Sequence, residues 1–305
     1  MRRSGSSRCG VARPDGRVDG EKSRERGVVV TIEAALRRLH LQSPRPESLA
    51  QFYSRAYGLE VSRAGSVVGC AGPGREVYIS PGTANQLHHA LYTFNAPSRW
   101  QAFCDRVSDL RQIDAASSPD LPRGAVSVID PDGHRMVFAL AEDPVISPSP
   151  GRLPAAMNQH FALRTTRIEE MLAFYRDRLG FVVSDRVLDP EGRLRACFLR
   201  TDALHHSLAL FGAAITCFDH QSFETPSWND LKDWADHMAR ERIEIVWGVG
   251  RHGPGNDAFF MVRDPDGNLA EISAEIETCA VDRMPGVWPH EERTLNLWGK
   301  AILRS

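Results

Sequence analysis

The feature that most constrains this chain is an internal duplication of one structural plan. The segment FYSRAYGL at 52–59 recurs as FYRDRLGF at 174–181, and VSVIDPDGHRMVF at 126–138 recurs as AFFMVRDPDGNLAEI at 258–272. Each copy has a strand, a helix and further strands in the same order. A repeat of this kind means that one supersecondary unit is built twice. The sequence therefore predicts an α+β fold built from tandem βαβββ modules. These modules would form two domains, each made of paired modules or of halves that resemble paired modules.

Changes in composition mark the expected domain boundaries. Residues 1–30 contain eight basic and four acidic residues and few large apolar ones, which predicts a disordered N-terminal tail. The first domain is expected over 31–143 and the second over 155–280. A linker rich in proline, serine and glycine separates them at 144–154. Residues 281–305 form a C-terminal extension, for which covering a pocket and making a subunit contact are both open.

Helix and turn signals place the main elements. The apolar spacing predicts helices at 44–58, 98–110, 168–180 and 228–240. Gly58 and Gly180 stand where a helix C-terminus favours glycine. The sequence Asp-Pro-Asp-Gly, at 130–133 and 264–267, is a strong turn signal because proline presets φ and glycine accepts a positive φ.

Composition excludes several classes of function. The net charge of −2 gives no electrostatic reason to expect nucleic acid or an anionic membrane. No apolar run approaches the roughly 18 residues that a membrane span requires. The six cysteines are scattered without a CxxC spacing. They are interpreted as reduced thiols of a cytoplasmic protein.

The repeat also aligns residues that could bind a metal. In the second copy, His160, His220 and Glu271 lie on three separate strands. Two imidazoles and one carboxylate are the ligands of a mononuclear facial-triad site, which leaves open positions on Fe(II). From the stretch around Glu271 alone, an arginine or lysine partner for this carboxylate is the more ordinary interpretation, and a metal ion is the other.

The corresponding positions in the first copy are His40, His89 and Val137. Val137 offers no ligand atom, so the first module is expected to be metal-free. His40 and His89 are interpreted as structural or vestigial. Replacing His40 should then leave the metal content unchanged.

Several motifs together resemble a known family. They are NQHFALRT, FYRDRLGF, DALHHSLALFG, HQSFETPSWNDL, WGVGRHGPGN and RDPDGNLAEI. In this order they are similar to the type I extradiol ring-cleavage dioxygenases of the vicinal oxygen chelate superfamily. The resemblance covers about residues 31–298 and implies the vicinal oxygen chelate fold.

The resemblance implies residue roles as well. His160, His220 and Glu271 would hold Fe(II), with Mn(II) as an alternative metal. His205 would act as the catalytic acid and base, and His252 would bind an oxygen of the substrate. The implied partners are a small catechol substrate and O2, and the implied assembly is a homo-oligomer. The chain departs from the family at Met261, where a tyrosine is common, because a thioether donates no hydrogen bond.

Two alternatives to extradiol cleavage remain at this point. One is another metal-dependent, glyoxalase-like enzyme, but its first copy should supply a carboxylate ligand where Val137 stands. The other is a non-catalytic ligand-binding or resistance protein of the same superfamily. Such a binder has no reason to keep two histidines and a glutamate at equivalent places.

Overall fold

The computed structural model describes residues 30–110, 121–142 and 153–303. The elements of the first module are, in chain order, β1 (Ala34–Ser43), α1 (Pro46–Tyr57), β2 (Glu60–Ala64), β3 (Val67–Gly72), β4 (Arg75–Pro81), β5 (Gln86–Phe94), α2 (Pro97–Arg106), β6 (Val126–Ile129) and β7 (Arg135–Leu140). The second module begins with β8 (Met157–Thr165), α3 (Ile168–Ala173), the π-helical turn η2 (Phe174–Arg178), β9 (Val182–Leu188), β10 (Leu194–Arg200) and β11 (Leu208–Gly212). It continues with β12 (Cys217–Thr225), α4 (Trp228–Arg240), β13 (Ile245–Arg251), β14 (Ala258–Arg263), β15 (Leu269–Ala274), β16 (Gly286–Pro289) and α5 (Glu292–Leu295).

The order of the strands confirms the duplication. Within the described ranges, one sheet has the order β2-β3-β4-β1-β5-β7-β6 and the other has the order β13-β14-β15-β12-β8-β11-β10-β9-β16. Read from the opposite edge, β9-β10-β11-β8-β12-β15-β14 repeats the first sheet strand for strand. β13 and β16 are additions at the two edges of the second sheet. The predicted α+β fold with two βαβββ-like halves is therefore confirmed.

Strand register also confirms the expected pairing of positions. Glu271 on β15 lies opposite Ser222, two residues after His220. Val137 on β7 lies opposite Leu91, two residues after His89. Val137 therefore occupies, in the first sheet, the place that Glu271 has in the second.

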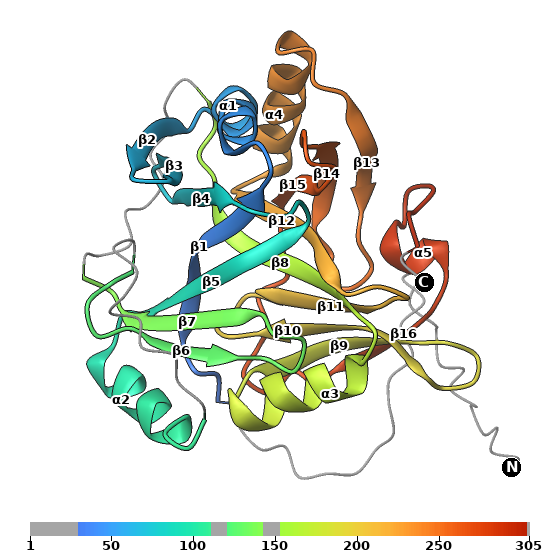
Figure 1. Cartoon of the computed structure of the whole chain (residues 1–305). Helices are drawn as coiled ribbons and strands as arrows, with labels where there is room; N and C mark the ends of the chain where they lie inside the picture. The colour runs from blue at the N-terminus through green and yellow to red at the C-terminus, as the bar shows by residue number, and fades with distance from the viewer. Residues whose placement is uncertain (1–29, 111–120, 143–152, 304–305) are drawn as a thin grey trace, which may run out of the picture.

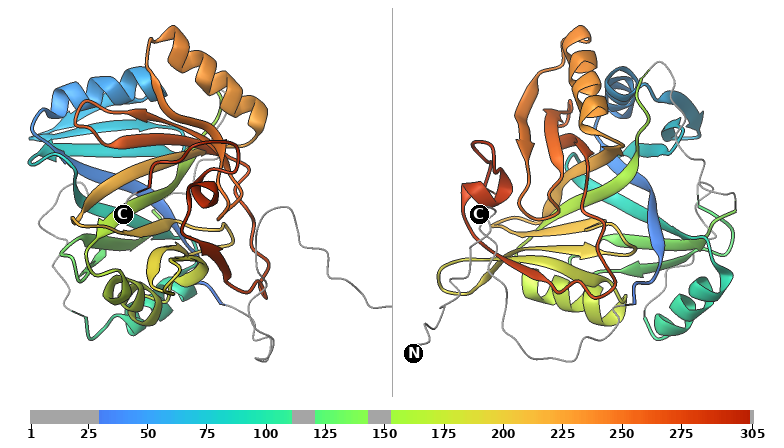
Figure 2. Two further views of the ribbon diagram at one scale, coloured as in Figure 1. Left: turned by 90° about the vertical axis from the view of Figure 1, so that its right-hand side faces the viewer. Right: turned by 180° about the vertical axis from the view of Figure 1, so that it is seen from behind.

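The two modules share one apolar core, to which both contribute side chains. The ring of Tyr57 in α1 packs edge-on against that of Phe223 in β12, with centroids 5.1 Å apart. The hydroxyl of Tyr92 in β5 donates to the Ser207 carbonyl at 3.3 Å. Helices α1 and α4 lie side by side at one end of the molecule, and α2 and α3 lie at the other (Figures 1 and 2).

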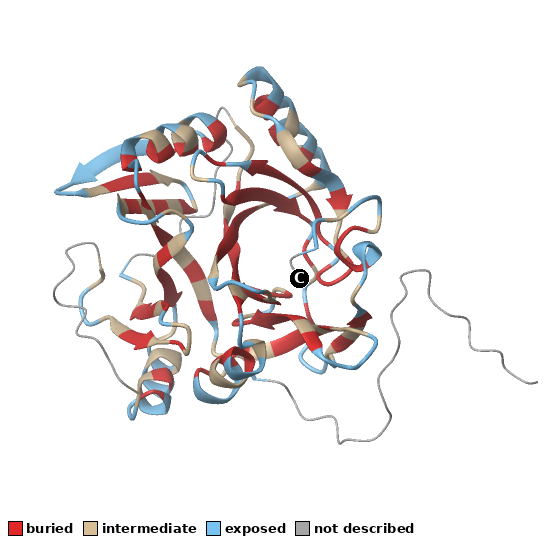
Figure 3. Cartoon of the chain, turned by 45° about the vertical axis from the view of Figure 1, so that its right-hand side comes forward, coloured by how far each residue is buried: buried red, intermediate tan, exposed pale blue. Residues whose placement is uncertain are grey.

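The second sheet buries its other face as well. A second apolar cluster, which includes Ala162, Phe198, Ala209 and Trp247, lies on that face. The central strands β10, β11 and β12 of this sheet are buried over most of their length, and Figure 3 shows much of the sheet in the colour of buried residues. The second sheet therefore has both faces covered, and side chains on either face can be shielded from water.

The two DPDG turns have the predicted geometry. Asp264 Oδ1 accepts hydrogen bonds from the backbone N–H groups of Asp266 and Asn268, both at 2.9 Å. Gly267 has φ of +92°, a conformation that a residue with a Cβ rarely adopts. The turn therefore fixes the start of β15, and with it the position of Glu271.

One predicted helix differs in the structure, and two of the predicted segments fall mostly on residues that the structure does not describe. The helix expected over 168–180 is α-helical only to Ala173 and continues as the π-helical turn η2. Residues 1–29 of the predicted tail and most of the linker at 144–154 lie outside the described residues. None of the helices in the described ranges is both long and apolar enough to cross a membrane.

Candidate active site

Three neighbouring strands bring the predicted metal ligands to one point. His160 is on β8, His220 on β12 and Glu271 on β15, and β12 pairs with both of the other strands. One ligand atom from each lies within 4.8 Å of the others. The two Nε2 atoms are 3.2 Å apart, and His220 Nε2 is 3.8 Å from Glu271 Oε2. All three side chains are buried.

Hydrogen bonds determine which nitrogen of each imidazole faces this point. His220 Nδ1 donates to Asp219 Oδ1 at 2.6 Å, and the other oxygen of Asp219 accepts from Arg164 Nε at 2.5 Å. His160 Nδ1 donates to the amide oxygen of Gln159. Because both partners are acceptors, each Nδ1 carries the proton and each Nε2 keeps its lone pair. Partners of this kind orient the histidine ligands of metal sites.

These residues fit a divalent metal ion. Two Nε2 lone pairs 3.2 Å apart repel each other unless a cation lies between them. That separation suits two ligands on one ion at metal–nitrogen distances of about 2.1 Å. Burial, together with the nearby His206 and His220, lowers the pKa of His160 well below its usual value, so its imidazole is neutral, as a ligand must be. Ser222 Oγ donates to Glu271 Oε1 at 3.2 Å and orients the carboxylate.

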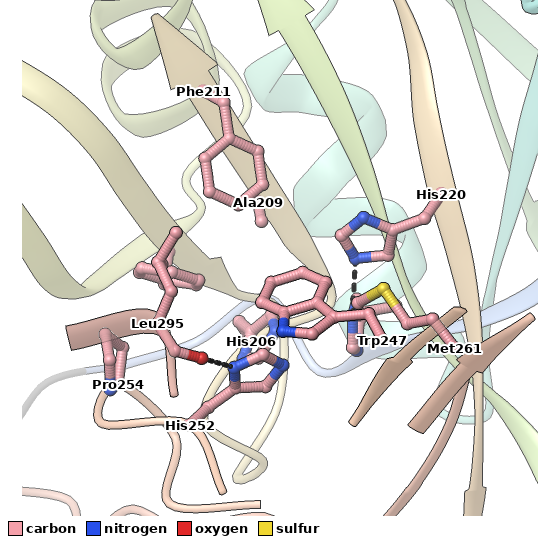
Figure 4. Close-up of a pocket in the computed structure, with 11 residues that line it drawn as sticks. His206, Ala209, Phe211, His220, Trp247, His252, Pro254, Met261 and Leu295 are labelled. Atoms are coloured by element: carbon pink, nitrogen blue, oxygen red, sulfur yellow. Dashed lines mark hydrogen bonds between the residues drawn. The ribbon is translucent and has the colours of Figure 1, made fainter. Parts of the chain in front are cut away.

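A cavity of about 360 Å³ opens beside the ligands. Figure 4 shows its lining side chains converging on one space from several elements. The residues that line it are His160, Phe198, His206, Ala209, Phe211, His220, Trp247, His252, Pro254, Met261 and Leu295. Its walls are thus mainly aromatic and apolar, with four imidazoles among them.

The structure places His252, a predicted catalytic residue, on the cavity wall. Its Nδ1 donates to the Leu295 carbonyl at 2.6 Å, and its Nε2 is 4.0 Å from Glu271 Oε2. The ring stacks on Phe259 with centroids 3.7 Å apart. The imidazole is therefore held at its far side and presents Nε2 to the site (Figure 4).

The structure places His206, and not His205, on the cavity wall. His205 is fully buried behind it, with Nε2 3.2 Å from Asp185 Oδ2 and Nδ1 3.0 Å from His206 Nδ1. The ring of His206 lies 4.3 Å from that of His160. His205 therefore does not line the cavity but contacts the carboxylate of Asp185, and the acid–base role expected for it stays a prediction.

The buried carboxylate of Asp185 influences which ring nitrogens of His205 and His206 carry protons. Burial raises the pKa of Asp185, but the hydrogen bond to His205 and the charges of His205 and Arg283 outweigh burial and hold it well below its usual value. Asp185 also accepts from Trp288 Nε1 at 2.7 Å. The ionised Asp185, 3.2 Å from His205 Nε2, favours the tautomer with the proton on that nitrogen, and His205 Nδ1 then accepts a hydrogen bond from His206 Nδ1–H. His206 Nε2 is then left as a proton acceptor.

The C-terminal extension covers the site. Leu295 of α5 lines the cavity, and its carbonyl holds His252. The backbone N–H of Gly253 donates to the Thr294 carbonyl at 3.0 Å, and that of Leu297 donates to the Arg251 carbonyl at 2.7 Å. Of the two roles left open for residues 281–305, covering the pocket is the one that the structure shows.

Sequence reasoning missed several functional positions. Gln159 and Asp219 orient the two histidine ligands, and each directly precedes the histidine that it contacts. A polar residue next to a predicted ligand was the available signal. Met261, where the family commonly has tyrosine, lies opposite Glu271 and lines the cavity as a thioether.

Comparisons with known proteins agree with this arrangement. Residues 159–272 match the family model described as "Glyoxalase/Bleomycin resistance protein/Dioxygenase superfamily". Metapyrocatechase 2 of Cupriavidus necator is 30% identical over 293 residues, which cover 84% of this chain and 86% of that protein. The chain belongs to the extradiol dioxygenase family. The segment that matches the family model, residues 159–272, contains His160, His220 and Glu271, the three predicted metal ligands.

Solved structures show the same fold at lower sequence identity. Homoprotocatechuate 2,3-dioxygenase from Arthrobacter globiformis superimposes with a TM-score of 0.73 at 21% identity, covering 92% of each chain. The Mn(II)-bound glyoxalase from Novosphingobium aromaticivorans gives a TM-score of 0.73 at 23% identity, covering 87% of this chain and 90% of that one. The vicinal oxygen chelate fold of this dioxygenase family member is therefore shared with enzymes of more than one activity.

Proposed function

We propose that this protein is an extradiol dioxygenase that opens a catechol-type ring next to its two hydroxyl groups. Both atoms of O2 enter the product, a 2-hydroxymuconate-type compound. The proposed metal is a single Fe(II) ion, with Mn(II) as the alternative. The observation that carries the proposal is the convergence of His160, His220 and Glu271 within 4.8 Å, on a cavity whose wall also holds two further histidines.

His160, His220 and Glu271 would hold the ion. An ion bound by such a triad supplies open coordination positions for a diol and O2 and the redox chemistry between them. The protein contributes a water-poor enclosure, in which Phe198, Phe211 and Trp247 form apolar walls around the ring. The catechol hydroxyls then face the imidazoles rather than solvent.

We assign the acid–base role to His206. Burial, together with the nearby His205 and His252, lowers the pKa of His206 well below its usual value, so the imidazole is neutral near pH 7. Its Nε2 can take a proton from a substrate hydroxyl and return it later. His252 Nε2 hydrogen-bonds a substrate oxygen and, once protonated, stabilises negative charge that develops there.

His205 is proposed as the positioning residue for His206. Replacing His205 with leucine removes the acceptor for His206 Nδ1–H, so the imidazole loses its fixed tautomer. We expect kcat to fall about 10- to 100-fold, as for other orienting partners, with KM and metal content nearly unchanged. His205→Gln offers an amide oxygen to the same proton and should retain most of the activity. Equal losses in the two variants would indicate a packing role only.

The test of the proposed function combines metal analysis with a catechol panel. Protein loaded anaerobically with Fe(II) or Mn(II), then given catechols and oxygen, should produce a yellow ring-opened compound. Glu271→Ala protein treated in the same way is the control and should remain colourless. A colourless result across a broad panel with fully loaded protein would overturn the proposal. It would favour a glyoxalase-like enzyme or a non-catalytic binding protein.

Cellular context and assembly are part of the proposal. Among the described residues, Cys70, Cys104, Cys197, Cys217 and Cys279 are free thiols. This supports a reducing, cytoplasmic location. The homo-oligomer implied by the family resemblance stays a prediction, and light scattering on the purified protein would test it.

A further inference from the structure

Three histidines of the first module lie together at the place that corresponds to the metal centre of the second. They are His40 on β1 and His88 and His89 on β5. One ligand atom from each lies within 4.8 Å of the others. The ring of His40 is 4.4 Å from that of His88 and 4.8 Å from that of His89, between centroids. The Nδ1 atoms of His88 and His89 are 2.9 Å apart.

A β-bulge explains how two consecutive residues reach the same point. In a regular strand, neighbouring side chains point to opposite faces of the sheet. Here His40 pairs with His89 and Leu41 pairs with Leu87, so His88 is the extra residue of β5. The bulge turns His88 toward the face of the sheet that carries His89. The group therefore gains a third imidazole in place of the carboxylate that is lost at Val137.

We propose that His40, His88 and His89 form a second metal site, which binds a borderline divalent ion such as Zn(II). Three imidazoles with one open position are an established zinc ligand set. His40 and His89 are buried, whereas His88 is partly exposed and gives the ion access from solvent. The expectation of a metal-free first module depended on Val137 and did not count His88.

The surroundings predict which metals the site prefers. Among the described residues, this group contains no carboxylate. Glu76, on the adjacent β4, is held by Arg37 at 2.6 Å and by Arg38 at 2.9 Å. An all-nitrogen donor set favours Zn(II), Ni(II) or Cu(II) over Mn(II), which prefers oxygen ligands. The two modules would thus bind different ions.

Equilibrium dialysis of the full chain against Zn(II), followed by elemental analysis, tests this site. With three imidazoles in one module and a triad in the other, wild-type protein should bind about two equivalents of Zn(II), and either His88→Ala or Glu271→Ala should bind about one. The double variant should bind none tightly. Co(II) used as a probe should give a visible absorption band in Glu271→Ala that disappears when His88 is also replaced.

Controls separate loss of a ligand from loss of the fold. His290→Ala changes a histidine that belongs to neither group and should retain two equivalents. His88→Gln keeps a polar side chain of similar length, and circular dichroism should show it to be folded as the wild type is. The proposal is overturned if wild-type protein binds a single equivalent, or if folded His88 variants still bind two. A failure of this kind leaves the catalytic assay of the second module unaffected.

Discussion

Replacement of His206 by alanine should lower kcat by about 10² to 10⁴, the range that a positioned acid–base group contributes. The reason is that His206 is the imidazole on the cavity wall whose Nδ1 is occupied by His205, which leaves Nε2 to exchange a proton with the substrate. Steady-state kinetics of metal-loaded protein measures the effect. Metal content should stay near the wild-type value, because His206 is not one of the three ligands.

The matched control for this experiment is His290→Ala. His290 directly follows β16 and is not among the residues that line the cavity. Its loss should leave kcat and KM unchanged. If His206→Ala kept full activity while His205→Leu abolished it, the assignment of His206 would be wrong and the original expectation for His205 would be restored.

Replacement of Glu271 by alanine should abolish tight metal binding at the second module and, with it, ring cleavage. Changes to the partners of metal ligands already cost about 10- to 100-fold in affinity. Loss of the one carboxylate of the triad should therefore exceed that range. Elemental analysis after dialysis against Fe(II) under anaerobic conditions measures the loss, and product formation should fall in parallel.

Glu169→Ala is a suitable control, since Glu169 is an exposed carboxylate on α3. It should retain the iron and the activity of the wild type. Retention of a full equivalent of iron at the second module in Glu271→Ala would contradict the ligand assignment. The variant should be checked by circular dichroism, because Glu271 is fully buried and its removal leaves a small cavity.

The fold and the convergence of three side chains could be predicted because both depend on the repeat. Aligning the two copies places His160, His220 and Glu271 on adjacent strands, and strand pairing then requires them to meet. Positions inside paired strands are well determined by sequence, since register fixes which face each side chain occupies.

The choice between His205 and His206 could not be predicted in this way. Ala209 and Phe211 of β11 line the cavity, so strict alternation continued backwards would select His205. The strand begins only at Leu208, and the preceding residues are irregular, so alternation does not extend to them. The position of His88 beside His40 and His89 was not predicted for a related reason, because a bulge shifts the alternation of side chains within β5. The contribution of Leu295 depends on a long-range contact that no local pattern encodes.

Because the two modules share one apolar core, the first module has a structural role that does not depend on catalysis. Tyr57 and Tyr92 pack against the second module, so removing the first half would expose apolar surface on the half that holds the triad. Binding free energy from an ion in one half is then available to stabilise the whole unit, by mass action on a common unfolding equilibrium. The first module therefore supports the folding of the half that holds the triad, whether or not it binds an ion itself.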